Sequence, residues 1–282
     1  MLIAQAAGVL FALGASVSWG GADFIGGLVS RRIGALQVLA LSRLAGLACY
    51  ATLAIIAQES LPPTESLLWA AAAGASGALG IAALYRGLAT EHSALVVPTS
   101  GVVGAAIPVV FAAAFQGVLP VVQQAGLVTA LVGIWLVSTG HGSTGAAASR
   151  GLAFGGLAGV GFGAFFVFLA QVEPGHVFTP LAVAGCASLS VSMLALKISG
   201  QNLPSPRRHS VAFLAGALDA TGAVCYLLAT QWIRLDVAAV LGSLYPAITV
   251  LLFRLGLKEH VSRTQWVGLA VCVVAIALIA AV

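Results

Sequence analysis

The chain has 282 residues, of which 60% are hydrophobic and only 7% are charged. Soluble domains carry about 25% charged residues, so this composition excludes an ordinary soluble enzyme and indicates a protein that crosses a membrane many times. The formal net charge of +4 fits basic loops at a membrane face, and no basic cluster exceeds the pair Arg207 and Arg208, which argues against a nucleic-acid partner.

Apolar residues fall into ten blocks of helix-spanning length. A bilayer core of about 30 Å needs roughly 20 apolar residues per helix, and lipid offers the backbone no hydrogen bonds, so each block predicts a helix and not a strand. The first block lacks a basic stretch before it and continues past Trp19, which predicts a membrane helix instead of a cleaved signal peptide. In chain order we expect helices at residues 6–28, 35–57, 67–89, 94–116, 121–140, 150–170, 178–198, 209–231, 236–257 and 262–281.

The two halves of the chain resemble one another when one is shifted by 142 residues against the other. Connection lengths match as well, long after the second and seventh blocks and short after the fourth and ninth. The shift places Gln123, Gly126 and Leu127 on Gln265, Gly268 and Leu269. These matches predict an all-α membrane protein of ten transmembrane helices, built from two five-helix repeats at residues 1–143 and 144–282.

Because five is odd, the second repeat must enter the membrane from the opposite side. Equivalent loops accordingly carry opposite charges: Arg31 and Arg32 against Glu173, and Glu59 and Glu65 against Arg207 and Arg208. The positive-inside rule produces this pattern when equivalent loops lie on opposite faces. Inverted repeats of this kind are typical of transporters that work by alternating access.

The repeat ends contain a recognisable pattern. The segment SLYPAITVLLFRLGLKEHVSRTQWVGLAVCVVAIALI resembles the last two helices of the EamA domain in the drug/metabolite transporter superfamily, through Pro246, Gly256, Glu259, Gln265 and Gly268. The first repeat is similar at Pro98, Gln123 and Gly126 but has Gly117 where the family has an acidic residue. SWGGADFIGG at residues 18–27 and Arg43 also look like helices 1 and 2 of this family.

The resemblance implies a multi-pass protein of the bacterial inner membrane that exports amino acids or other small metabolites. A multidrug or other metabolite carrier of the same fold is the alternative. We expect a small-molecule substrate and the lipid bilayer as partners, and neither a cofactor nor a metal. No ATP-binding motif is present, so the energy for any uphill transport would come from a gradient.

Charged residues inside the predicted helices are the sharpest candidates for a functional site, because each costs about 2.5–3.5 kcal/mol to insert. Asp219 lies near the middle of the eighth helix, Arg43 in the second helix and Asp23 in the first. A carboxylate here could bind a cation, a proton or a substrate amine, and Arg43 could bind a carboxylate. The competing interpretation is a structural pair between Arg43 and an aspartate that fixes helix packing.

Aromatic residues are candidates for lining a binding cavity. Tyr85 and Tyr226 occupy near-equivalent places in the two repeats, and Tyr245 and Trp19 complete the predicted lining. Rings with a polar tip suit amphipathic ligands, although ordinary packing explains the same residues equally well.

Glycine and proline predict how the helices pack. Glycines at residues 151, 155, 159 and 163 form one stripe that predicts close contact with a neighbouring helix. Pro98, Pro108 and Pro246 predict kinks in the fourth and ninth helices.

An enzyme of another class fits the sequence poorly. Gly74-Ala-Ser76-Gly77 matches the motif of rhomboid-type intramembrane serine proteases, but such a serine needs a histidine base within a helix. All five histidines fall in predicted loops or at helix ends, so we do not expect an enzyme.

Orientation in the membrane stays open. Most basic loop residues fall on one face and only Arg234 on the other, so the positive-inside rule places both termini outside. Many members of the superfamily that the sequence resembles are described with cytoplasmic termini.

Overall fold

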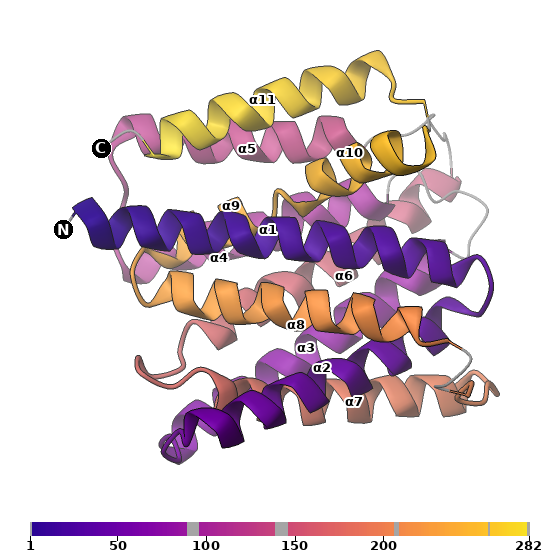
Figure 1. The fold of residues 1–282 in the computed structure, drawn as a ribbon. Helices are drawn as coiled ribbons and strands as arrows, with labels where there is room; N and C mark the ends of the chain where they lie inside the picture. The colour runs from indigo at the N-terminus through magenta and orange to yellow at the C-terminus, as the bar shows by residue number, and fades with distance from the viewer. Residues whose placement is uncertain (1, 89–95, 139–145, 206–208, 259, 281–282) are drawn as a thin grey trace.

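The computed structural model describes residues 2–88, 96–138, 146–205, 209–258 and 260–280 (Figure 1). Arg207, Arg208 and Glu259, which contribute to the charge pattern and the family motif, lie outside these residues. The described residues form helices and no strand. In chain order the helices are α1 (Leu2–Ser30), α2 (Ala35–Ala57), α3 (Thr64–Leu88), α4 (Val96–Phe115), α5 (Val121–Ser138), α6 (Ala146–Leu169), α7 (Phe178–Ile198), α8 (Val211–Thr230), α9 (Leu235–Gly242), α10 (Tyr245–Leu257) and α11 (Arg263–Ala280).

Helix ends follow from local chemistry, as α2 illustrates. It begins after Gly34, whose backbone N–H donates to the side chain of Gln37 at 3.0 Å and so satisfies one donor at the helix start. It ends at Ala57, and the following Gln58 adopts a left-handed conformation with φ 48°. The observed bounds of α2 and of α7 are those predicted from the apolar blocks.

The ninth predicted helix is divided into α9 and α10. Pro246 has no N–H to donate to α9, and its fixed φ suits the first turn of a new helix, so α10 begins one residue before it. The kink predicted at Pro246 is therefore confirmed as a break at residues 243–244. In contrast, α4 continues without a break past Pro98 and Pro108, and the kinks predicted there stay a prediction.

The outer surface is suited to lipid. Counting α9 and α10 as one, nine stretches of described residues are long and apolar enough to cross a membrane, and α11 is a shorter apolar helix. Large apolar side chains point outward, including Ile55, Val121 and Leu255, each at least 76% exposed. Water disfavours so apolar a surface and a bilayer accommodates it. The chain is a multi-pass membrane protein.

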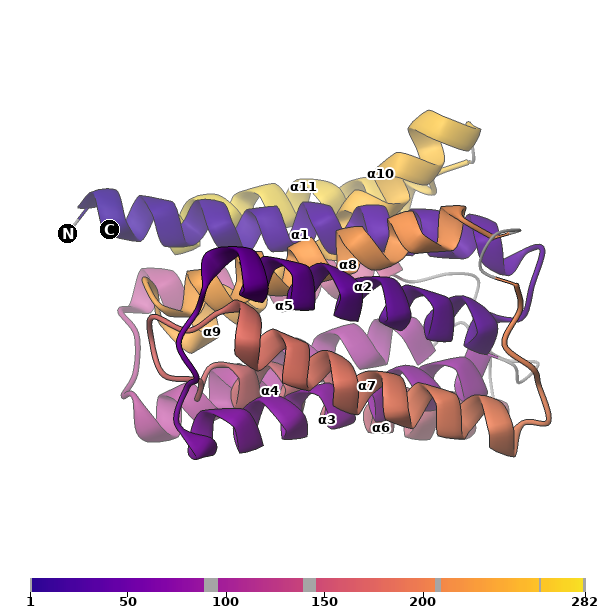
Figure 2. The ribbon, with the colours of Figure 1, turned by 60° about the horizontal axis from the view of Figure 1, so that its bottom comes forward.

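Two groups of helices face each other across the molecule (Figure 2). In the first, called the α3/α6 bundle, α6 packs on α3 and α4, and α7 packs on α3. In the second, called the α1/α8 bundle, α1 packs on α8, α9 and α10, and α2 packs on α8. The bundles meet where α2 contacts α7 and where α4 contacts α9, and α5 and α11 pack along each other.

Glycine gives the α3/α6 bundle its close packing. A Cβ on Gly159 would lie 2.5 Å from the Cβ of Val103 in α4, and one on Gly155 would lie 2.7 Å from the Cβ of Thr99. On another side of α6, a Cβ on Gly161 would lie 2.6 Å from the Cα of Gly80 in α3. The close contact predicted from the glycine stripe is confirmed, because none of these helices could approach so nearly with a larger residue.

The molecule has two ends. Both chain termini lie at one end in Figure 1, which we call the terminal face, together with the connections at residues 58–63, 116–120, 170–177 and 231–234. The α1–α2 connection at residues 31–34 lies at the other end, called the opposite face, with residues 199–205 and 260–262.

Candidate functional site

A cavity of about 740 Å³ lies between the two bundles. Both bundles contribute to its wall: α3, α4, α6 and α7 on one side, and α1, α2, α8 and the α9–α10 break on the other. Ser30 and Ala35, which flank the α1–α2 turn, belong to the lining, so the cavity extends to the opposite face. Its volume is typical of a site for a small organic molecule.

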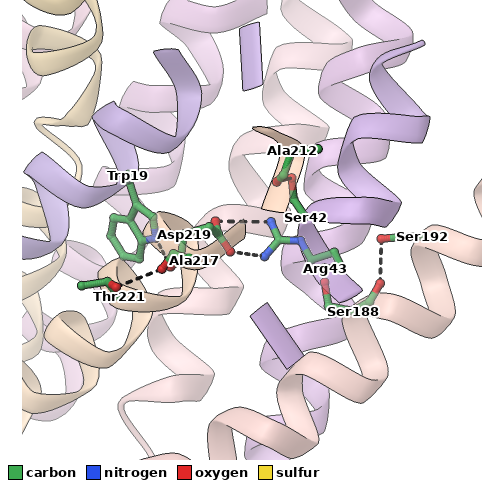
Figure 3. A network of polar contacts seen from close by, with 9 residues as sticks. All are labelled: Trp19, Ser42, Arg43, Ser188, Ser192, Ala212, Ala217, Asp219 and Thr221. Atoms are coloured by element: carbon green, nitrogen blue, oxygen red, sulfur yellow. Dashed lines mark hydrogen bonds and ion pairs between the residues drawn. The ribbon is translucent and has the colours of Figure 1, made fainter. Parts of the chain in front are cut away.

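An ion pair crosses the α1/α8 side of this wall (Figure 3). The Arg43 Nη1 donates to Asp219 Oδ2 at 2.5 Å, and Nη2 lies 3.5 Å from Oδ1, so the two planar groups meet as a fork. The two side chains are 19% and 26% exposed, and both line the cavity. The Arg43–Asp219 ion pair therefore joins α2 to α8, as the structural interpretation of these charges predicted. The same pair also faces the cavity.

Asp23 lies in the same wall. Its exposed side chain lines the cavity from α1 and is near enough to Asp219 and Arg43 for electrostatic interaction with both. Among the described lining residues, the charged side chains are these two aspartates and one arginine. With both carboxylates ionised, the cavity has an excess of negative charge.

Aromatic residues close the cavity toward the terminal face. Trp19 lines it with Phe165 and Phe166, and the ring centroids of Trp19 and Phe166 are 5.7 Å apart. The indole Nε1 of Trp19 donates to the backbone carbonyl of Asp219 at 3.2 Å, as Figure 3 shows, which fixes the ring against α8. We call Trp19, Phe165 and Phe166 the aromatic floor.

The four predicted aromatic residues have different places. Trp19 and Tyr245 line the cavity. Tyr226 does not: it is fully buried beneath the floor, its ring centroid 6.0 Å from that of Trp19, and its hydroxyl donates to the carbonyl of Phe166 at 2.9 Å. Tyr85 lies in α3, but its side chain is outside the described residues, so the predicted pairing of Tyr85 with Tyr226 stays a prediction.

Some lining residues escaped the sequence analysis. Tyr50 in α2 lines the cavity, and its position seven residues after Arg43 puts it on the same helix face, a signal that was present in the spacing. Phe162 and Phe165 in α6 gave no such signal, because a run of phenylalanines in an apolar helix is also what packing requires.

Ser76 lacks the surroundings of a catalytic serine. Its Oγ donates to the carbonyl of Ala73 in its own helix at 3.0 Å. His176 lies in the connection at the terminal face, where its Nε2 is 3.2 Å from the Oγ of Ser60. A nucleophile needs its base within hydrogen-bond reach, and the described contacts of Ser76 supply none.

Comparison with known proteins supports the fold and its class. Residues 149–281 match the model of the EamA-like transporter family. A protein of known crystal structure superposes with a TM-score of 0.76 at 18% sequence identity, over 96% of this chain and 95% of that one, which shows a common fold. No curated protein matches the sequence.

Proposed function

We propose, because residues 149–281 match the model of the EamA-like transporter family, that the whole chain is a secondary transporter that moves a small organic solute by alternating access. The observation that carries this proposal is the cavity between the two bundles, which has charged groups in its wall and is closed toward one face by aromatic rings. Alternating access needs such a site near the middle of the membrane.

The pattern of helix contacts supports two inverted repeats at residues 1–143 and 144–282. If each helix of the first repeat is exchanged for its counterpart in the second, the contact of α3 with α6 becomes that of α8 with α1, and the contact of α3 with α7 becomes that of α8 with α2. The contacts of α2 with α7 and of α5 with α11 map onto themselves. A two-fold axis in the membrane plane would produce this exchange.

The lead substrate class is amino acids or related amphipathic metabolites, exported across a bacterial inner membrane. A zwitterion has a partner for each of its parts: Arg43 for the carboxylate, Asp23 for the amine, and the aromatic floor for an apolar side chain. Asp219 would hold Arg43 in place, and a guanidinium retains further donors when one carboxylate is bound.

The alternative is a carrier of organic cations, including drugs. One observation favours it: the described lining has two aspartates against a single arginine that is already paired with Asp219. A monocation would neutralise Asp23 and stack on the aromatic floor without involving Arg43.

Counterflow in liposomes that contain the purified protein tests both substrate classes. Labelled amino acids and labelled aromatic monocations would each be exchanged against unlabelled solute. The double variant Arg43→Gln with Asp219→Asn removes the ion pair without leaving either charge alone, so it should abolish amino-acid exchange and spare monocation exchange. Asp23→Asn should abolish both, and Arg263→Gln at the start of α11 is the matched control. Exchange of neither class by the parent protein would contradict the assignment of substrate.

A further inference from the structure

The terminal face is closed by two charged side chains that each bind the end of a helix in the α3/α6 bundle. Neither touches the cavity, and neither belongs to the ion pair described above. One is Arg234, which precedes α9, and the other is Glu59, which follows α2. Both α2 and α9 belong to the α1/α8 bundle, so each contact crosses between the bundles.

Arg234 binds the C-terminal end of α4. Its Nη1 donates to the carbonyl of Gln116 at 2.8 Å, and its Nη2 donates to the carbonyl of Gly117 at 2.6 Å. Asp236 orients the guanidinium from the other side, with Oδ1 3.2 Å from Nε and Oδ2 3.0 Å from Nη2. The carbonyls at a helix C-terminus lack partners within the helix and carry partial negative charge, so a cation stabilises them.

Glu59 binds the N-terminal end of α7. One carboxylate oxygen accepts the N–H groups of Val177 and Phe178 at 2.5 and 3.2 Å, and the other accepts that of Thr179 at 2.5 Å. These are the donors that a helix start leaves free, and an anion complements their partial positive charge. The left-handed Gln58 turns the chain out of α2 immediately before this contact.

The two contacts match each other in chemistry. An anion from the α1/α8 bundle binds a helix start of the α3/α6 bundle, and a cation from the same bundle binds a helix end. The first lies where α2 meets α7 and the second where α4 meets α9, which are two of the places where the bundles touch. Opening the cavity to the terminal face would separate these helices and break both sets of hydrogen bonds.

We propose that Glu59 and Arg234 are the gating residues of the terminal face: together they form a two-point lock that keeps the cavity closed on that side and must release in each transport cycle. The proposal rests on the alternating access of the proposed function and does not depend on which solute is carried. Without the lock, the protein spends more of its time open to the terminal face.

Thiol accessibility measures this population directly. Leu47 lines the cavity from the middle of α2, so Leu47→Cys, in a protein whose four native cysteines are replaced by serine, reports entry of a membrane-impermeant methanethiosulfonate. The reagent is applied separately to each face, and protease cleavage of a C-terminal tag identifies the terminal face. In the parent protein, labelling should be fast from the opposite face and slow from the terminal face.

Glu59→Gln and Arg234→Gln should each raise the labelling rate from the terminal face by roughly 10-fold, the shift expected for losing charge-assisted hydrogen bonds that exist in only one state. Glu65→Gln and Arg263→Gln are matched controls and should leave the rate unchanged. Arg234→Gln removes the cation that is paired with the buried Asp236, so this variant could fail to reach the membrane. In that case the double variant Arg234→Gln with Asp236→Asn is used in its place.

The outcomes separate the two proposals. If the parent protein is labelled from one face only and neither Glu59→Gln nor the Arg234 variants raise labelling from the terminal face, the lock is wrong and alternating access stands. Equal labelling of the parent protein from both faces would overturn alternating access and the lock with it.

Discussion

The interface between the two bundles differs at its two ends. At the terminal face, aromatic rings fill it, and the carboxylate of Glu59 and the guanidinium of Arg234 join it. Toward the opposite face, the same helices enclose the cavity, and a neutral hydrogen bond from the Gln37 side chain to the carbonyl of Asn202 connects α2 to the segment after α7, at 2.8 Å. The two ends therefore differ in the side chains that join the bundles.

The proposed repeat gives Glu59 at the terminal face a counterpart at the opposite face. Gln201 follows α7 as Glu59 follows α2, and it lies beside the start of α2, with its Oε1 2.9 Å from where a Cβ of Gly34 would be. An acid at one end thus corresponds to an amide at the other. A neutral amide binds a helix start more weakly than a carboxylate does, so the two ends are expected to differ in how firmly they close.

The largest loss of stability is expected from disrupting the Arg43–Asp219 ion pair in the cavity wall, between the two ends. Asp219→Asn removes the carboxylate from a partly buried pair, leaves Arg43 without that anion, and should lower the free energy of unfolding by about 2–4 kcal/mol. Thermal unfolding in detergent measures the loss, and Arg43→Gln added to Asp219→Asn should restore most of it. Unchanged stability together with normal transport by Asp219→Asn would show that the carboxylate has neither role.

The interior of a bundle should tolerate less change than the cavity wall. Gly161→Ala places a methyl group against the backbone of α3 and should destabilise the protein by about 1–3 kcal/mol. Gly26→Ala is the matched control, because its Cβ would face the cavity with Val38 4.0 Å away. Equal melting temperatures for the two variants would mean that the bundles are not the rigid parts of the molecule.

A smaller effect is expected beneath the aromatic floor. Tyr226→Phe deletes the hydroxyl that donates to Phe166 and should cost about 0.5–1.5 kcal/mol of stability, while leaving the charged wall intact. Solute affinity measured by counterflow should be nearly unchanged, whereas Trp19→Ala, which alters the lining, should weaken it. A loss of affinity in Tyr226→Phe as large as that in Trp19→Ala would assign Tyr226 a direct part in binding.

The smallest effect concerns acid at the terminal face. Burial raises the pKa of Glu59, but the backbone N–H bonds from Thr179, Val177 and Phe178 outweigh it and hold the pKa below its ordinary value of 4.5. The stability that Glu59 contributes is therefore present above pH 4.5 and is lost as the pH falls through the lower, folded-state pKa. Melting temperatures of the parent protein and Glu59→Gln should differ at neutral pH and converge in acid, and a constant difference would contradict this assignment.

The positions of the helices could be predicted because a membrane span must be helical, apolar and about 20 residues long, and each of these properties can be read from a single stretch of sequence. The apolar blocks had to be helical and long enough to span, and Pro246 had to disturb the ninth of them, whatever the rest of the chain did. The Arg43–Asp219 pair was foreseeable as one of two interpretations, since charges inside a membrane seek partners.

The place of Tyr226 could not be predicted in the same way. It was predicted to line the cavity because it and Tyr85 occupy near-equivalent places in the two repeats. Tyr226 lies behind the Trp19 ring, which packs on Gly222 one helical turn before it and so separates Tyr226 from the cavity. Where the floor lies depends on Trp19 packing against Gly222 across two helices, which no pattern within α8 contains.

The break between α9 and α10 divides one span into parts with different neighbours. Every residue of α9 is buried, whereas only Pro246 and Ala247 are buried in α10. Tyr245 and Phe253 of α10 line the cavity, while Leu255 near its end is 76% exposed on the outer surface. A single short helix thus contributes both to the cavity wall and to the outer surface, and two non-helical residues join it to the buried α9. A change in bilayer thickness would therefore act on this wall of the cavity through α10, whereas every residue of α9 is shielded from lipid.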